Sequence, residues 1–278
     1  MKKKIDVTTY RLEYQNLPVS FDGCRIGFLS DLHNNEIGRN NTYLLQTIKK
    51  RQFDYFFCVG DMIIGTDYGS FQYEKTLEFI QKLSEIAPVY YALGNHEERM
   101  RQKDLADGTK ILYQYKKELL HRNVIVLDGT SIELFKKGQA ITLKGLSLGM
   151  EFYKKWWKRT PLSKSNIEQQ IRQKNGFTIM LAHNPVYFKT YDAYGAELVL
   201  SGHVHGGIMI LPKLGGIISP ELMPFPKYDF GYFEGSNSKM ILSRGLGTHT
   251  IPIRIHNRPE FIDITLNRTC ELDRQLVK

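Results

Sequence analysis

The chain has 278 residues, of which 42% are hydrophobic and 24% are charged, as in a globular protein with a sizeable core. Its formal net charge of +9 favours anionic partners such as phosphate esters, nucleic acid or a lipid surface, although a basic surface that serves only solubility explains it equally well. The three cysteines have no paired spacing and no run approaches the ~20 apolar residues of a membrane span, which argues against a disulfide-bonded scaffold and a membrane-spanning chain.

Cysteine usage and the first residues indicate a reducing compartment. Cys24 and Cys58 fall in apolar runs that look like strands, where a free cysteine behaves as a small buried hydrophobic residue. The basic residues 2–4 are followed at once by polar residues, unlike the apolar stretch of a signal peptide. We expect a cytoplasmic protein, with peripheral contact to a membrane as the further possibility.

The first half of the chain alternates strand patterns with helical patterns. Strands are predicted over residues 10–14, 24–29, 55–59 and 89–93, and helices over residues 40–51, 71–86 and 108–120. Because residues 24–59 form a strand-helix-strand unit, parallel pairing with a right-handed crossover is expected there. His121 follows the last of these helices, where an imidazole interacts favourably with the helix dipole, so we interpret it as structural.

The second half changes to short strands. Residues 124–127, 132–135 and 141–148 are separated by turn residues and predict antiparallel hairpins. Further strands are predicted over residues 177–181, 198–200, 240–242 and 261–266, a polar helix over 165–174, and a loop folded over the site at 208–230. We expect a single domain, residues 1–278 with a core at about 22–268, of the α/β class: a four-layer α/β/β/α sandwich of two mixed sheets flanked by helices.

A cap-like insert lies around residues 151–175. It places Trp156 and Trp157 among the four basic residues of segment 154–159. Tryptophan favours interfaces that are apolar on one side and wet on the other, and basic residues attract anionic lipid. The same composition also suits a cap over the site with its rings packed inside and its charges in solvent.

Five apolar runs end in residues that can bind metal. Ligands of α/β sheets gather at the carboxyl ends of strands, so we expect these ends to meet. Seven ligands are too many for one zinc-like site, whereas two ions about 3.5–4 Å apart and bridged by a carboxylate use them all. Mixed imidazole and oxygen ligands suit Mn, with Fe or Zn as alternatives, better than Ca or Mg. The candidate ligands are Asp31, His33, Asp61, Asn95, His183, His203 and His205.

Two such ions predict phosphoester hydrolysis. They can bridge and activate a hydroxide and neutralise the oxygens of a phosphate during in-line attack. His96 has no obvious place among the ligands if Asn95 binds metal, so we expect it to give a proton to the leaving oxygen. The alternative for His96 is a residue that only supports the ligands or the packing.

The chain resembles the calcineurin-like metallophosphoesterase superfamily in five motif blocks that occur in the same order: Asp31-Leu32-His33, Gly60-Asp61, Gly94-Asn95-His96-Glu97, His183 and Gly202-His203-Val204-His205. Residues 243–247 and 252–254 add a similarity to the bacterial branch of small phosphodiesterases that are often tethered to membranes. The resemblance implies that Asp31, His33, Asp61 and His205 hold one ion, that Asn95, His183 and His203 complete the other with Asp61 bridging, and that His96 is the leaving-group acid.

Two alternatives to a small-molecule or lipid-linked phosphoesterase remain. One is a nuclease of the same superfamily, but no basic stripe interleaved with aromatics or recognised nucleic-acid motif is found, so no specific nucleic acid is expected as partner. The other is a non-catalytic metal-binding scaffold, which would have no need of His96 beside its metals. Segment 60–65 lacks the second Asp and the Arg of the superfamily's protein phosphatases. His249 and His256 are interpreted as solvated loop residues.

Overall fold

The computed structural model describes residues 5–65, 73–172, 176–207, 210–211, 215–217, 219, 221–248, 254 and 256–269. Its first six-stranded sheet has the order β1-β14-β2-β3-β4-β5. Only β14 and β2 pair antiparallel, so the sheet is mixed. The strands are β1 Asp6–Tyr14, β2 Cys24–Leu29, β3 Tyr55–Val59, β4 Val89–Ala92, β5 Val124–Leu127 and β14 Glu260–Arg268.

The second six-stranded sheet has the order β12-β13-β9-β8-β7-β6. Its two edge strands pair antiparallel and its central strands pair parallel. The strands are β6 Thr130–Lys136, β7 Gln139–Leu146, β8 Thr178–Ala182, β9 Leu198–Ser201, β12 Gly231–Glu234 and β13 Lys239–Leu242. A separate two-stranded sheet is formed by β10 Ile210–Leu211 and β11 Gly215–Gly216.

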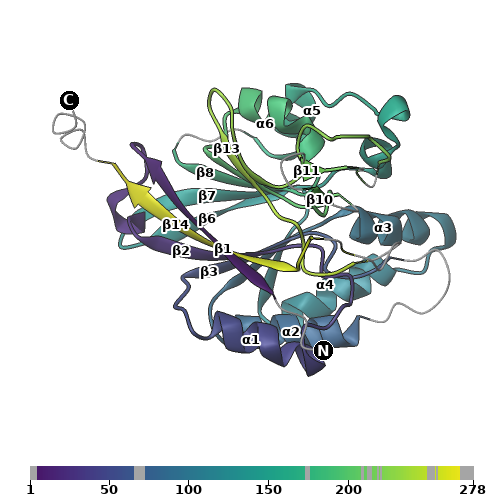
Figure 1. The fold of residues 1–278 in the computed structure, drawn as a ribbon, viewed down its shortest axis with the longest axis horizontal. Coiled ribbons are helices and arrows are strands. Elements are labelled where there is room, and N and C mark those ends of the chain that lie inside the picture. The colour runs from purple at the N-terminus through teal and green to yellow at the C-terminus, as the bar shows by residue number, and fades with distance from the viewer. Residues whose placement is uncertain are drawn as a thin grey trace.

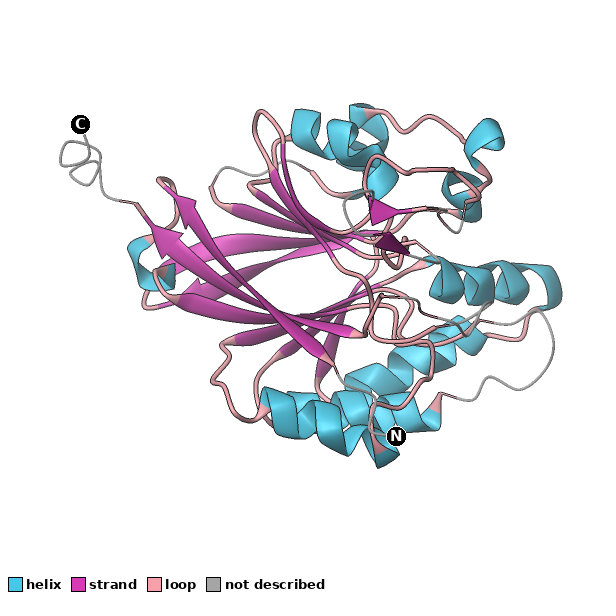
Figure 2. Cartoon of the chain, in the orientation of Figure 1, coloured by secondary structure: helices cyan, strands magenta, loops and turns pink. Residues whose placement is uncertain are grey.

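Helices cover the outer face of each sheet (Figures 1 and 2). Buried residues of α1 Thr42–Ile48, α2 Glu74–Ser84 and α4 Ile111–His121 pack on the first sheet, and those of α5 Lys164–Gln170 and α6 Phe188–Tyr194 pack on the second. A third apolar cluster joins the sheets, with Ile26 and Phe57 from one side and Leu181 and Leu200 from the other. The predicted four-layer sandwich is therefore confirmed.

The central parallel strands are short apolar runs because both of their faces are covered. In β3, the four residues Phe56–Val59 are all buried, and the same holds for every residue of β4, β8 and β9, as parallel sheets require. Cys24 and Cys58 are buried and free, as predicted, whereas Cys270 lies outside the described residues.

Three features differ from the prediction. Strand β5 pairs parallel with β4 in the first sheet, so the expected hairpin with the following strand is wrong; the chain crosses at Asp128-Gly129 to the second sheet, where β6 and β7 do form an antiparallel hairpin. Helix α3, Asn95–Asp107, and helix α6 were not predicted. Strand β1 pairs along its whole length with β14, so residues before position 22 belong to the first sheet.

The carboxyl ends of β2, β3, β4, β8 and β9 meet at one edge of the sandwich. Backbone hydrogen bonds join the loops there: Asp31 N–H donates to Gly60 O, and Gly202 N–H donates to His183 O, both at 3.0 Å. We call this edge, with the loops that follow these strands, the metal edge.

Candidate metal centre

Strained backbone marks the loops of the metal edge. Asp31, His33, Asp61, His203 and His205 all have positive φ, between 49° and 71°, a region that residues other than glycine rarely adopt. Strain of this kind persists only where surrounding contacts hold it, and it gathers at functional sites. Here the N–H of His33 donates to the carbonyl of Asp61 at 3.0 Å, so each loop holds its neighbour.

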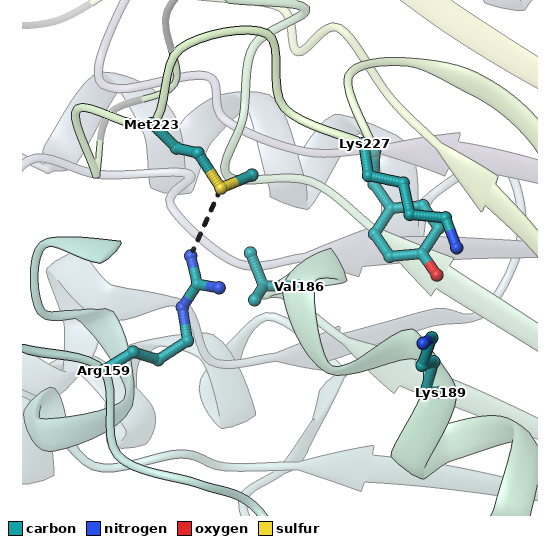
Figure 3. A pocket seen from close by; sticks show the side chains of 6 residues that line it. Arg159, Val186, Lys189, Met223 and Lys227 are labelled. Atoms are coloured by element: carbon teal, nitrogen blue, oxygen red, sulfur yellow. Dashed lines mark hydrogen bonds between the residues drawn. The ribbon is translucent and has the colours of Figure 1, made fainter. Parts of the chain in front are cut away.

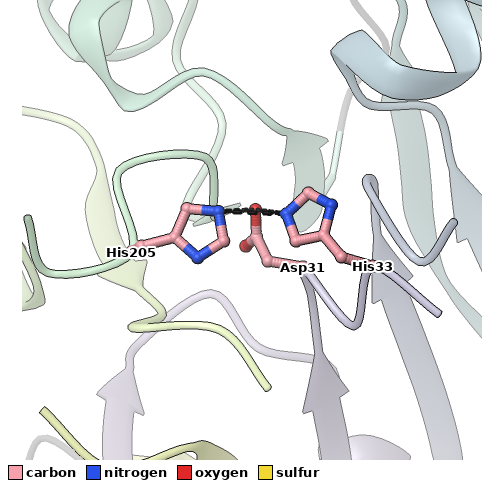
Figure 4. A group of neighbouring side chains, drawn as sticks. All are labelled: Asp31, His33 and His205. Carbon is pink, nitrogen blue, oxygen red and sulfur yellow. Dashed lines mark hydrogen bonds and ion pairs between the residues drawn. The ribbon is translucent and has the colours of Figure 1, made fainter. Parts of the chain in front are cut away.

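Asp31 lies among three imidazoles. Its Oδ1 is 3.9 Å from His33 Nε2, 3.8 Å from His183 Nε2 and 3.4 Å from His205 Nε2. The stacked rings of His33 and His205 bring their Nε2 atoms to 3.0 Å, and both point toward the Asp31 carboxylate (Figure 4). Burial raises the pKa of Asp31 to about 6. Ligand atoms of Asp31, His33 and His205 thus converge on one small volume.

A second carboxylate, that of Asp61, lies between two groups of potential ligands. Its Oδ2 is 3.2 Å from His183 Nε2, 3.9 Å from His96 Nε2 and 4.0 Å from His33 Nε2. Burial alone would raise the pKa of Asp61, but these imidazoles lower it well below its ordinary value. Asp61 belongs to two groups of potential ligands, one with His33 and His96 and the other with His183 and His203, as a bridging carboxylate would.

Two glycines permit this approach of carboxylates to backbone. A Cβ on Gly94 would lie 2.3 Å from Asp61 Oδ1, and one on Gly202 would lie 2.3 Å from Asp31 Oδ2. Any side chain at either position would displace an aspartate of the centre.

The hydrogen bond of His183 selects its metal-binding nitrogen. Nδ1 lies 2.8 Å from the carbonyl of Val59, and only a protonated Nδ1 can donate there, so the lone pair of the neutral ring is on Nε2. That atom faces both carboxylates. Burial alone would lower the pKa of His183, but Asp61 and Asp31 raise it to about 9.

A buried acceptor at the metal edge fits a cation. Asn95 Oδ1 is buried and has no hydrogen-bond partner among the described residues, and the buried His203 Nε2 lies 3.5 Å from Glu221 Oε1. Asn95 sits between Gly94, which touches Asp61, and His96, whose N–H donates to Asp61 Oδ1 at 2.8 Å. Unpaired buried acceptors are costly, and amide oxygen and imidazole are suitable metal donors. The residues present therefore fit divalent ions.

His96 presents one particular ring nitrogen to the centre. Its Nδ1 accepts the N–H of Gly65 at 3.0 Å, so the proton of the neutral ring is assigned to Nε2. Nε2 is the atom that faces Asp61. Because Nδ1 accepts a hydrogen bond and Nε2 carries the proton, the neutral ring is arranged for proton donation rather than for metal binding.

Glu97 holds the second carboxylate in place, a role that its position in the motif did not reveal. Its Oε2 accepts the N–H of Asp61 at 3.0 Å and that of Gly94 at 2.9 Å, and its Oε1 accepts the hydroxyl of Tyr91. Burial raises the pKa of Glu97 to about 7. All of these partners are buried, so the end of β3 and the start of α3 are tied through one side chain.

Glu221 was also missed, because it comes from the loop predicted over residues 208–230. Its Oε1 accepts Asn184 Nδ2 at 3.0 Å and lies 3.5 Å from His203 Nε2, while its Oε2 accepts Arg159 Nη2 at 2.6 Å. The N–H of Trp156 donates to its carbonyl at 3.2 Å. The described part of the loop thus lies over the site and joins it to the insert.

The insert has an inner and an outer side. The ring of Tyr153, in the 3-10 helix η3 Met150–Tyr153, packs edge-on against His203 with centroids 5.1 Å apart. Trp156 and Trp157, in η4 Trp156–Lys158, are 48% and 53% exposed. The expectation of a cap with both tryptophans packed inside is therefore wrong, because Phe152 and Tyr153 fill the inner side.

Two further described histidines belong to none of these ligand groups. His121 ends α4 and is exposed, and His256 is exposed with φ 53°. His249 lies outside the described residues.

A family model, "Calcineurin-like phosphoesterase", matches residues 24–207. This match spans all eight predicted site residues and all five strand ends. The chain belongs to the calcineurin-like phosphoesterase family. It is accordingly a hydrolase of phosphoric esters that depends on divalent metal ions.

Relatives of this phosphoesterase have between 23% and 28% sequence identity with it. It is 28% identical to the uncharacterized metallophosphoesterase YkuE of Bacillus subtilis, over 95% of this chain and 86% of that protein. It is 23% identical to the phosphodiesterase YaeI of Escherichia coli, over 72% and 67%. A transmembrane protein with a metallophosphoesterase domain from Danio rerio is 25% identical, over 96% of this chain and 57% of that protein. No helix among the described residues of the phosphoesterase is long and apolar enough to cross a membrane.

Proposed function

We propose that this phosphoesterase hydrolyses a phosphodiester, pyrophosphate or phosphomonoester with two divalent ions, Mn in preference to Fe or Zn. The observation that carries the proposal is the position of Asp61 between two groups of imidazoles. In this assignment Asp31, His33, Asp61 and His205 hold one ion. Asn95, His183 and His203 hold the other, with Asp61 shared.

The bound ions supply an activated water for in-line attack and positive charge for the phosphate oxygens. The chain's own residues orient both. Glu97 fixes the backbone of Asp61, Val59 fixes the ring of His183, and Gly65 fixes that of His96. His96 gives its Nε2 proton to the leaving oxygen in this proposal.

The substrate class that we propose is a phosphate ester that is small or lipid-linked. The exposed rings of Trp156 and Trp157 support a peripheral contact with anionic membrane, because Lys155 lies over the Trp157 ring at 5.4 Å and Lys154 and Lys158 flank the pair. The membrane-linked relative is consistent with this contact.

A hydrolysis screen tests the function. Metal-loaded protein is assayed against phosphomonoesters, phosphodiesters, nucleotides and lipid pyrophosphates, with the Asp31→Asn variant as a background control. We expect activity on at least one class in the wild type alone. Turnover of DNA or RNA above all small esters would favour the nuclease alternative, and a metal-loaded protein inactive on every class would favour the scaffold.

A further inference from the structure

A cationic pocket lies beside the metal edge, outside the residues that bind metal in the proposed function. It has a volume of about 190 Å³ and is lined by Arg159, Val186, Lys189, Met223, Lys227 and Tyr228. Figure 3 shows the Arg159 guanidinium on one side of the pocket and the two lysines on the other, with Val186 between them. Three segments therefore supply its wall: the insert, the start of α6 and the loop of Glu221.

The charge of this pocket favours an anion. Three of its six lining residues are cations and none is acidic. Arg159 is held by Glu221 through Nη2 at 2.6 Å, while its Nε is buried and has no hydrogen-bond partner among the described residues. Lys189 and Lys227 are exposed. Lysine and arginine side chains are common protein ligands of phosphate.

The pocket adjoins the metal edge through Glu221. One oxygen of this carboxylate accepts Arg159 and the other lies 3.5 Å from His203 Nε2. Val186 lies in the short turn η5 Pro185–Tyr187, which begins two residues after His183 and leads into α6, where Lys189 lies. One carboxylate thus separates the guanidinium of the pocket from an imidazole of the centre.

The remaining wall is apolar and fixed. The ring of Tyr228 packs edge-on against Phe188 and Phe233, with centroids 5.7 and 5.1 Å apart. Lys227 lies over the same ring at 5.2 Å, and Met223 Sδ lies 4.0 Å from Arg159 Nη2. This wall suits the organic part of a ligand whose phosphate is held by the cations.

We propose that the pocket binds a second phosphate group of the substrate, while the ester phosphate that is cleaved lies at the metal edge. This inference rests on the proposed function. It narrows the substrate class to esters in which two phosphates are joined through an organic group, which contacts Val186, Met223 and Tyr228. Arg159 and Glu221 set the separation of the two phosphate sites.

Calorimetry with a series of alkane-α,ω-bisphosphates tests this pocket without any need for turnover. Each bisphosphate of three to eight carbons is titrated into metal-loaded protein beside the alkane monophosphate of equal length. At least one bisphosphate should bind about 10-fold to 100-fold more tightly than its monophosphate, since each charge-assisted contact has an effect of that order. The double variant Lys189→Ala/Lys227→Ala should lose most of this advantage.

The variant Lys49→Ala/Lys50→Ala is the matched control, because it removes the same charge from exposed positions next to α1. It should keep the bisphosphate advantage. The pocket proposal is overturned if no bisphosphate binds more tightly than its monophosphate, or if the control variant loses as much affinity for the bisphosphate as the pocket variant does. Failure of the proposed function looks different: no ester is hydrolysed in the screen, while the bisphosphate advantage and its dependence on the two lysines are still measured.

Discussion

The carboxylate of Glu97 accepts the backbone N–H of Asp61 at 3.0 Å. It thereby connects the second residue after β3 to helix α3, which begins two residues before Glu97. The proposed bridging ligand is thus positioned through its main chain, from a residue that binds no metal in this assignment.

Glu97→Ala should therefore destabilise the protein and loosen the centre. It leaves the buried N–H groups of Asp61 and Gly94 without their acceptor, at a cost of about 1–3 kcal/mol for each unpaired group. Urea unfolding of the metal-free protein measures this change. Glu78→Ala, on the exposed face of α2, should stay within about 0.5 kcal/mol of wild type. Equal stability of the two variants would contradict the role of Glu97.

Asp61→Asn and His205→Ala should differ in metal content. A bridging carboxylate serves both ions, so its loss should weaken both by about 10-fold or more, whereas His205 groups with Asp31 and His33 alone among the described residues. Metal analysis after dialysis should find about two ions per chain in wild type, about one in His205→Ala and fewer in Asp61→Asn. A metal content of one tightly bound ion per wild-type chain would contradict the two-ion proposal.

His96→Ala should keep its metals and slow turnover, by about 100-fold to 10,000-fold if proton donation is its role. The loss should be smaller for nitrophenyl esters, whose leaving group needs no proton. Rates on esters of good and poor leaving groups, with metal content measured in parallel, check this. An equal loss on both would point to positioning, and loss of metal would place His96 among the ligands.

Metal binding should release protons. His183 has a pKa of about 9 in the metal-free centre, so at pH 7 its Nε2 carries a proton that an ion must displace, and affinity should rise with pH toward about 9. Asp31, with a pKa of about 6, is mostly ionised at pH 7 and adds to the release only below that pH. Calorimetry in buffers of different ionisation enthalpy counts the protons; none released at pH 7 would refute the prediction.

Vesicle binding tests the outer side of the insert. The wild type should co-sediment with anionic but not neutral vesicles, and less at high salt because the electrostatic attraction is screened. Trp156→Ser/Trp157→Ser should abolish sedimentation and retain hydrolysis of a small soluble diester. Phe135→Ser removes an exposed ring from β6 and should bind as wild type does. The membrane proposal would be contradicted if the wild-type protein did not co-sediment with anionic vesicles.

The ends of the strands that meet at the metal edge could be predicted from the sequence because each strand is an apolar run followed by a polar residue that can bind metal. A strand such as residues 55–59 can be predicted from its local sequence alone. A strand that is buried on both faces is an unbroken apolar run wherever it lies in a parallel sheet. The convergence of these ends then follows from topology alone. Ligand atoms of Asp31, His33 and His205 lie close together in the structure.

Helix α3 was not predicted because its buried face is polar. Asn95, His96, Glu97 and Glu98 are buried there, with Met100 as the one buried apolar residue of the helix, so an apolar period of 3.6 residues never develops. Strand β5 was given the wrong partner because Asp128-Gly129 has the composition of a hairpin turn. Glu221 could not be found from its neighbours in sequence, since every group that it holds comes from another segment.

Strand β14 has a consequence for the order in which the phosphoesterase folds. It lies between β1 and β2, so residues 260–268 must insert between two strands from the first 29 residues of the chain. Until that stretch has left the ribosome, β1 cannot join the sheet and β2 presents an open edge, the kind of edge that pairs readily with other chains. Completion of the first sheet is therefore a long-range event, and the edge of β2 stays open until residues 260–268 have been synthesised.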